Sequence, residues 1–230
     1  MKLNKGFFVI GTDTGIGKTY ISSLLYKGIK DFQGGYYKPI QSGCIQKENR
    51  LVAPDVEFVC SVANIPYDEK MVTYTLEAEV SPHLASEMEN TEIDIDKILK
   101  DWQELQNRYR YMVVEGAGGL YVPLIRDKFY IFDLIKKLNL PVILVCSSRV
   151  GAINHSMLTI EMLKKLGIDI HGLVFNNVTD DFNRDYFEKE VRTVLCVRDL
   201  ERSRNFYQQT LELVPVWDGG MEGCRFAAAG

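Results

Sequence analysis

The chemistry of this chain is concentrated in a glycine-rich segment near its beginning, Gly11-Thr12-Asp13-Thr14-Gly15-Ile16-Gly17-Lys18-Thr19. The segment follows an apolar run and precedes a helical pattern, which is the setting of a phosphate-binding P-loop. Its backbone N–H groups and a helix N-terminus would bind a polyphosphate, with Lys18 at the outer phosphates and the Thr19 hydroxyl on Mg²⁺. The strict motif is missed by one place, because Thr12 stands at the first-glycine position. A glycine-rich turn with a surface lysine is the alternative interpretation.

Two carboxylates could complete a magnesium site. Glu115 ends a buried apolar run and precedes four small residues, Gly116 to Gly119, while Asp55 lies near the start of a predicted helix. Mg²⁺ prefers oxygen ligands and usually takes only one or two carboxylates from a protein. Each carboxylate also has a purely structural interpretation: a buried strand-end acid for Glu115, and a helix N-terminal acid favoured by the helix dipole for Asp55.

A second lysine, Lys38, precedes Pro39 at the end of a short strand-like segment. Alone, this pair would indicate no more than extended backbone, because a residue before proline avoids the helical region. Beside a P-loop it favours catalysis, since phosphoryl transfer needs cations positioned around the transferred group.

Apolar runs alternate with helical patterns along most of the chain, which is typical of βα units around a parallel sheet. Strands are expected at 6–10, 36–39, 111–115, 141–146 and 170–176, and helices at 19–32, 55–62, 82–88, 94–109, 132–138 and 153–166. We therefore predict a three-layer α/β fold of the P-loop NTPase type, with a mostly parallel central sheet and helices on both faces. Ligands of such sheets bind beyond the carboxyl ends of the strands. The P-loop, Lys38, Glu115 and Asn176 should therefore meet in one crevice.

The composition narrows the class of protein. Hydrophobic residues make up 46% and charged residues 25% of 230 residues, an ordinary balance for one large globular domain. A net charge of −4 without a basic cluster argues against nucleic acid or an anionic membrane as a partner. The first residues show no signal-peptide pattern, and no stretch approaches the ~20 apolar residues of a membrane span. Five cysteines without a CxxC pair favour a reduced, cytoplasmic protein.

Further motifs stand in a fixed order behind the P-loop. Few other P-loop proteins combine such a glycine loop with both a K-P-x-x-S-G and an E-G-A-G-G segment. The whole set consists of Gly11–Thr14 with Gly17–Thr19, Lys38–Gly43, Asp55, Ser81–Ala85, Glu115–Gly119, Val122–Pro123, Gly151–His155 and Asn176. Over about residues 5–180, the order and spacing of this set resemble the dethiobiotin synthetase family.

The resemblance implies an ATP- and Mg²⁺-dependent ligase of biotin biosynthesis. Such an enzyme forms the ureido ring of dethiobiotin from 7,8-diaminopelargonate and CO2, through a carbamate and a carbamic–phosphoric anhydride. It also implies a homodimer in which residues 151–155 complete the substrate site of the other subunit. Matched residues then receive these roles: catalysis by Lys18 and Lys38; metal binding by Thr19, Asp55 and Glu115; and substrate contacts by Thr14, Lys38, Ser42, Pro82, Val122 and Asn154. The nucleotide contacts implied are Gly15, Ile16, Gly17, Lys18, Thr19, Tyr20, Asp55, Glu115, Gly116, Ala117, Gly118, Asn176 and Asn177.

The chain departs from that family near its end, so we predict a synthetase-like domain over 1–190 and an atypical tail over 191–230. A strand, a helix start at Asp199 and the pair Phe206-Tyr207 are similar to the opening βαβ unit of the vicinal oxygen chelate, or glyoxalase-like, family. Arg192 stands where that family often has a metal-binding histidine, so metal chemistry is not expected of the tail. A grafted fragment and an accidental likeness both stay open, and the family's loop over the adenine is not recognisable.

Three other functions compete with ligation. A partitioning or division-site ATPase would carry a second lysine five residues before Lys18, where this chain has Asp13. An amidoligase for a larger cofactor acid is a second candidate, although segments 38–43 and 81–83 favour the small diamine. A nucleotide-binding protein without catalysis, its ATP pocket left open by the altered tail, is the third.

Overall fold

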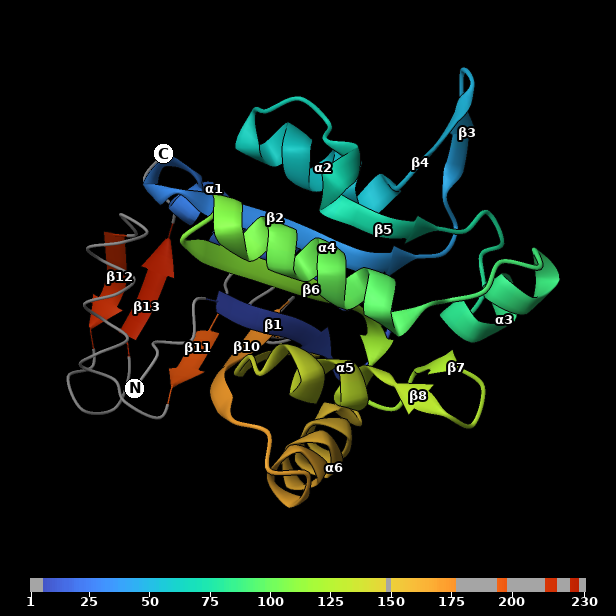
Figure 1. Cartoon of the computed structure of the whole chain (residues 1–230). Coiled ribbons are helices and arrows are strands. Elements are labelled where there is room, and N and C mark those ends of the chain that lie inside the picture. The colour runs from blue at the N-terminus through green and yellow to red at the C-terminus, as the bar shows by residue number, and fades with distance from the viewer. Residues whose placement is uncertain (1–5, 148–149, 177–193, 198–213, 219–223, 228–230) are drawn as a thin grey trace.

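A seven-stranded sheet forms the centre of the protein (Figure 1). The computed structural model describes residues 6–147 and 150–176, together with three strands at 194–197, 214–218 and 224–227. The sheet has the order β11-β10-β9-β1-β6-β2-β5. Its strands are β1 (Gly6–Gly11), β2 (Gly34–Gln41), β5 (Val72–Thr75), β6 (Tyr111–Gly119), β9 (Val142–Ser147), β10 (Ile170–Asn176) and β11 (Val194–Val197). Neighbouring strands are parallel from β5 to β10, and β11 runs antiparallel to β10.

Helices cover both faces of this sheet. Helix α1 (Lys18–Ile29) and α2 (Pro54–Ala63) pack with Val9, Tyr36 and Val113 in one buried cluster. On the other face, α4 (Ile95–Arg108), α5 (Ile131–Leu138) and α6 (Ala152–Lys165) contribute to a second cluster with the remaining side chains of the same strands. Strands buried on both faces read as unbroken apolar runs, and the sequence 142–147 is an example. Two cores on the two sides of one sheet give the three layers that were predicted.

Short elements complete the described part of the chain. Helix α3 (Pro82–Met88) begins with a proline, as does α2, and a proline fits the first turn of a helix because its missing N–H would lack a partner there. The side chain of Asp94 accepts from the Asp96 N–H at 2.8 Å and caps α4. The small hairpins and 3₁₀ helices are β3 (Ile45–Lys47) with β4 (Arg50–Val52), β7 (Pro123–Ile125) with β8 (Phe129–Tyr130), β12 (Val214–Asp218) with β13 (Cys224–Ala227), Lys30–Phe32 and Glu69–Met71.

The predicted fold class is confirmed, with local differences. Strand β6 continues to Gly119, four residues beyond the predicted end at Glu115; its register with β1 shifts in this stretch, where Gly118 has φ of 68°. Strand β5 and the three hairpins were not predicted. Of the tail, β11 joins the edge of the main sheet and β12 pairs with β13. The division at residue 190 stays a prediction, because most of 191–230 lies outside the described residues. Among the helices described, none has the length and apolarity needed to cross a membrane.

Candidate functional site

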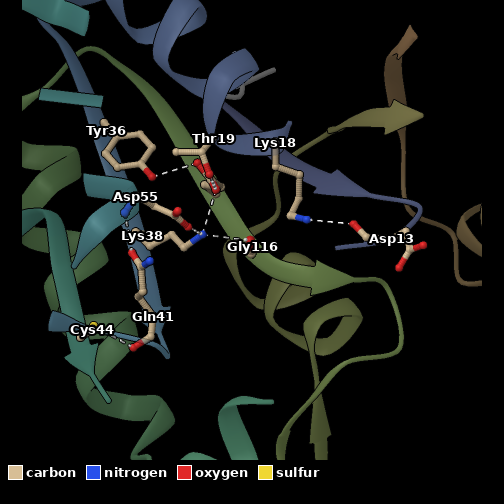
Figure 2. A network of polar contacts seen from close by, with 10 residues as sticks. Asp13, Lys18, Thr19, Tyr36, Lys38, Gln41, Cys44, Asp55 and Gly116 are labelled. Atoms are coloured by element: carbon tan, nitrogen blue, oxygen red, sulfur yellow. Dashed lines mark hydrogen bonds and ion pairs between the residues drawn. The ribbon is translucent and has the colours of Figure 1, made fainter. Parts of the chain in front are cut away.

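The P-loop connects β1 to α1, as the motif requires. Gly17 immediately precedes α1 with φ of 89°, and a Cβ atom there would stand 2.0 Å from the Asn176 side-chain nitrogen. Only glycine fits both the backbone and the space. Lys18 is buried, and its Nζ donates to the carbonyl oxygen of Asp13 at 2.9 Å (Figure 2). The lysine therefore lies along the inside of the loop, where a bound polyphosphate would replace the carbonyl as its partner.

Asn176, at the end of β10, contacts the P-loop. Its Nδ2 donates to the carbonyl oxygen of Ile16 at 2.9 Å. That bond fixes the amide orientation and leaves Oδ1 buried without a hydrogen-bond partner among the described residues. A buried acceptor without a donor costs about 1–3 kcal/mol, so this oxygen marks a position where a ligand donor is favoured.

Lys38, on β2, lies between the two carboxylates that the sequence singled out. Its Nζ donates to Asp55 Oδ2 at 2.5 Å and to Glu115 Oε1 at 2.8 Å, with the Gly116 carbonyl oxygen at 3.4 Å (Figure 2). Lys38 and Glu115 are both almost entirely buried, whereas Asp55 is partly exposed. The ammonium therefore supplies the cation that the buried Glu115 carboxylate needs, and it also pairs with the partly exposed Asp55.

Glu115 is the centre of this polar network. Its Oε1 also accepts from the Thr19 hydroxyl at 2.8 Å, and its Oε2 accepts from the Tyr36 hydroxyl at 2.9 Å. Two strands, β2 and β6, and the P-loop helix α1 thus meet at one carboxylate. These contacts bring together the P-loop helix, Lys38 and Glu115.

The charges of the network perturb one another. Burial alone would lower the pKa of Lys38, but the Glu115 and Asp55 carboxylates raise it to about 12. For Asp55, partial burial opposes the effect of the Lys38 ammonium, which holds the pKa of the carboxyl below its usual range. Burial, followed by repulsion from Lys38, lowers the pKa of Lys18. Lys38 is thus paired with the two carboxylates, whereas Lys18 bonds to a backbone carbonyl oxygen of the P-loop and is the ammonium placed to face anionic phosphates.

The donor set fits magnesium. Among the described residues there is no group of three His, Cys, Asp or Glu side chains placed to bind a metal. There are two carboxylates, Asp55 and Glu115, and the Thr19 hydroxyl that already contacts Glu115. A few oxygen ligands of this kind, with water and phosphate completing the octahedron, are what Mg²⁺ commonly takes. The structure thus brings together the three predicted metal ligands.

Two of the predicted substrate residues, Thr14 and Val122, lie next to each other. A Cβ atom on Gly118 would meet Val122 at 2.8 Å and Thr14 at 3.8 Å, so these residues of two loops adjoin. Ser42 follows directly on β2 and is half-buried. Pro82 is the buried first residue of α3. Glu87 of the same helix accepts two hydrogen bonds at 2.7 Å from Arg126, which directly follows β7, and this ion pair joins α3 to β7.

The other predicted contacts are placed as follows. Ile16 is buried, and Tyr20, Gly116 and Ala117 are buried or half-buried near the P-loop and at the end of β6, whereas Gly15 is exposed. Asn154 is exposed on α6, among exposed apolar side chains. Asn177 lies outside the described residues.

Sequence reasoning missed two residues of the network. The Gln41 Oε1 accepts from the Asp55 N–H at 3.2 Å and so ties the start of α2 to β2. Tyr36 contacts Glu115, and a signal for it existed: it lies two residues before Lys38 on one strand, so both side chains point to the same face.

Comparison with known proteins gives consistent matches. Residues 5–202 match a family model described as an AAA domain. The ATP-dependent dethiobiotin synthetase BioD of Fusobacterium nucleatum is 59% identical over 197 residues, covering 86% of this chain and 89% of that protein. The enzymes of the same name from Clostridium perfringens and Anoxybacillus flavithermus are 40% and 36% identical, covering 87% and 93% of this chain and 94% and 99% of theirs.

Proposed function

Because this chain belongs to the family of ATP-dependent dethiobiotin synthetases, we propose that its site forms the ureido ring of dethiobiotin from 7,8-diaminopelargonate and CO2. The observation that carries the proposal is the cluster of Lys18, Lys38, Thr19 and Glu115 at the carboxyl ends of the parallel strands. Such a cluster is suited to phosphoryl transfer, in which catalysis is mostly positioning and electrostatic stabilisation.

ATP is the nucleotide that the site favours. Its phosphates would lie on the P-loop N–H groups and the N-terminus of α1. Asn176 Oδ1 has no donor within the described part of the chain, and the exocyclic amine of adenine would supply one. Guanine has a carbonyl oxygen at the corresponding position, which would face another acceptor. GTP should therefore be the poorer co-substrate.

Magnesium would be held by Thr19, Asp55 and Glu115, and when bound it would neutralise charge on the β- and γ-phosphates. Because Lys38 contacts both carboxylates, its ammonium has to move away from them when a metal takes its place. The nearest new anions are then the phosphates and the substrate carbamate. Lys38 would there stabilise the charge that develops during transfer.

The chemistry follows in two steps. One substrate amine and CO2 first form a carbamate. An oxygen of this carbamate attacks the γ-phosphorus, and ADP leaves with the electrons of the broken P–O bond. The second amine then attacks the carbamoyl carbon of the anhydride, loses a proton, and expels phosphate as the five-membered ring closes. Lys18 on the outer phosphates and Lys38 beside the transferred group stabilise the first step. Thr14, Ser42, Pro82 and Val122 would hold the diamine at the adjoining surface.

The test is ATP consumption by the purified chain with magnesium and bicarbonate, with and without 7,8-diaminopelargonate. We expect phosphate release that requires the diamine, with dethiobiotin as product. Replacing ATP by GTP should weaken nucleotide use about 10–100-fold, because a buried acceptor is then left unpaired. Nucleotide binding without diamine-dependent phosphate release would show a binding protein in place of a ligase.

We also propose a homodimer formed through the α6 face, which we define as the exposed apolar side chains Val150, Ile153, Met157, Leu158 and Tyr121. Tyr121 belongs to this face because its hydroxyl contacts the Met162 sulfur at 3.4 Å. Exposed apolar groups gathered on one surface are typical of an interface. Asn154 lies within this face, so the second subunit would bring Asn154 to its neighbour's substrate site.

Replacing Leu158 by glutamate is expected to give a monomer, because a charge at an apolar interface is buried without a partner. Dethiobiotin formation should fall about 10²-fold, the cost of a mispositioned substrate. Sedimentation velocity checks the first result and a product assay the second. Phe58→Glu is the matched control: Phe58 is also exposed, on α2 across the sheet, and should leave dimer and activity unchanged. A monomeric, fully active wild type would contradict the proposal.

A cytoplasmic location is proposed on the chemistry of the thiols. Cys44 and Cys60 are buried and form no disulfide. Burial raises the pKa of Cys44 to about 11, which keeps it a neutral thiol. Reduced thiols of this kind suit a reducing compartment.

A further inference from the structure

Tyr36 is a fully buried residue to which the proposed chemistry assigns no role. It lies on β2 in the cluster beneath α1 and α2, with its ring centroid 6.1 Å from that of Tyr26. Its hydroxyl donates to Glu115 Oε2 at 2.9 Å.

The two oxygens of Glu115 have different surroundings. Oε1 accepts from Thr19 Oγ1 and from Lys38 Nζ, both at 2.8 Å, and so faces the proposed metal ligand and the cation of the site. Oε2 faces the apolar cluster and accepts from Tyr36. The carboxylate is therefore held with one oxygen toward the site and the other away from it.

We propose that Tyr36 is a positioning residue that holds Glu115 as a one-oxygen ligand of magnesium. The inference rests on the proposed magnesium site. Mg²⁺ demands a near-ideal octahedron, whereas Ca²⁺ accepts carboxylates through one or both oxygens. By occupying Oε2, the Tyr36 hydroxyl disfavours two-oxygen binding. Tyr36 therefore contributes both to metal affinity and to the preference for Mg²⁺ over Ca²⁺.

The test removes only the hydroxyl. Tyr36→Phe keeps the ring in its cluster and frees Oε2. Mn²⁺ binding to the complex with a non-hydrolysable ATP analogue, followed by electron paramagnetic resonance, should weaken at least about tenfold, as loss of a hydrogen bond to a metal ligand generally does. Ca²⁺ should displace Mn²⁺ more readily from this variant than from the wild type. Affinity for the nucleotide without metal should stay unchanged.

Tyr37→Phe is the matched control. Tyr37 is the next residue on β2 and equally buried, but its hydroxyl contacts Thr73 Oγ1 and the Ile98 carbonyl oxygen on the other face of the sheet. This variant loses a buried hydroxyl of the same kind, so its thermal stability should fall while its Mn²⁺ and Ca²⁺ binding stay those of the wild type. A merely structural role of Tyr36 would predict the same pattern for both variants.

A second variant carries 4-aminophenylalanine at position 36, which keeps an N–H donor at the ring end. The weaker donor predicts a Mn²⁺ affinity below that of the wild type and above that of Tyr36→Phe. If Tyr36→Phe does not fold, the comparison of the 4-aminophenylalanine variant with the wild type decides. Equal Mn²⁺ binding in the wild type and the position-36 variants overturns the inference. A loss of Mn²⁺ affinity in Tyr36→Phe that the N–H donor of 4-aminophenylalanine does not reduce also overturns it. A wild type without a nucleotide-dependent Mn²⁺ site would instead overturn the proposed magnesium site itself.

Discussion

Replacing Lys38 by alanine is expected to lower the rate of dethiobiotin formation about 10²–10³-fold while leaving ATP affinity nearly unchanged. Lys18 lies along the loop that would hold the phosphates, whereas Lys38 contacts Asp55 and Glu115 from β2. The charge of Lys38 is therefore available to the transferred group and contributes little to nucleotide binding. Product formation at saturating substrates measures the first effect, and isothermal titration with an ATP analogue the second.

The same substitution leaves Glu115 buried without its cation, so the free energy of unfolding should fall by about 3–5 kcal/mol. Added Mg²⁺ should recover part of this loss, because a divalent ion can take the place of the ammonium. Lys47→Ala is the control, since the Lys47–Glu57 pair is exposed and such pairs contribute little. If Lys38→Ala lost nucleotide binding instead, Lys38 would belong to the nucleotide phosphates.

Lys18→Ala should abolish turnover, lowering the rate by at least about 10²–10³-fold, with the fold intact. Its Nζ bonds to the Asp13 carbonyl oxygen and forms no ion pair with the buried carboxylates, so the substitution leaves their cation in place. In contrast to Lys38→Ala, this variant should also bind Mg–ATP more weakly, because the lost charge faces the β- and γ-phosphates. The two variants are therefore distinguished by titration and by thermal unfolding as well as by rate.

Lys27→Ala is the matched control for Lys18→Ala, because Lys27 lies on the same helix in an exposed position. It should behave as the wild type in rate, titration and unfolding. Near-normal activity of Lys18→Ala would show that the glycine-rich segment is not a P-loop.

The layers of the fold could be predicted because the central strands are apolar on both faces and the helices between them carry clear apolar stripes. Strand β5 was missed for a physical reason: it has four residues, alternates polar with apolar side chains, and lies at the parallel edge of the sheet. The strands of the hairpins β3–β4 and β7–β8 have only two or three residues, too few to show a recognisable alternation of polar and apolar side chains. The glycines at 116 and 118 are typical of a loop in the sequence, yet both residues belong to strand β6.

The candidate site could be predicted as a set of residues and not as a set of contacts. Glu115 lies opposite Val9 in the parallel register of β1 and β6, and that register places it beside Thr19. A sequence does not specify which residues of two distant strands lie opposite each other. For the same reason the Tyr36–Glu115 bond and the link from Gln41 to Asp55 emerged only from the structure.

The hydrogen bond from Asn176 to Ile16 has a consequence for how the protein is made. It joins residues 160 positions apart, and the Thr19–Glu115 bond joins residues 96 positions apart. A chain emerging from the ribosome contains its P-loop sequence first, yet the strand that braces the loop emerges much later. Contacts so distant in sequence form slowly. The nascent chain therefore has no complete nucleotide site until β10 is in place, and ATP cannot act as a template for the earlier strands.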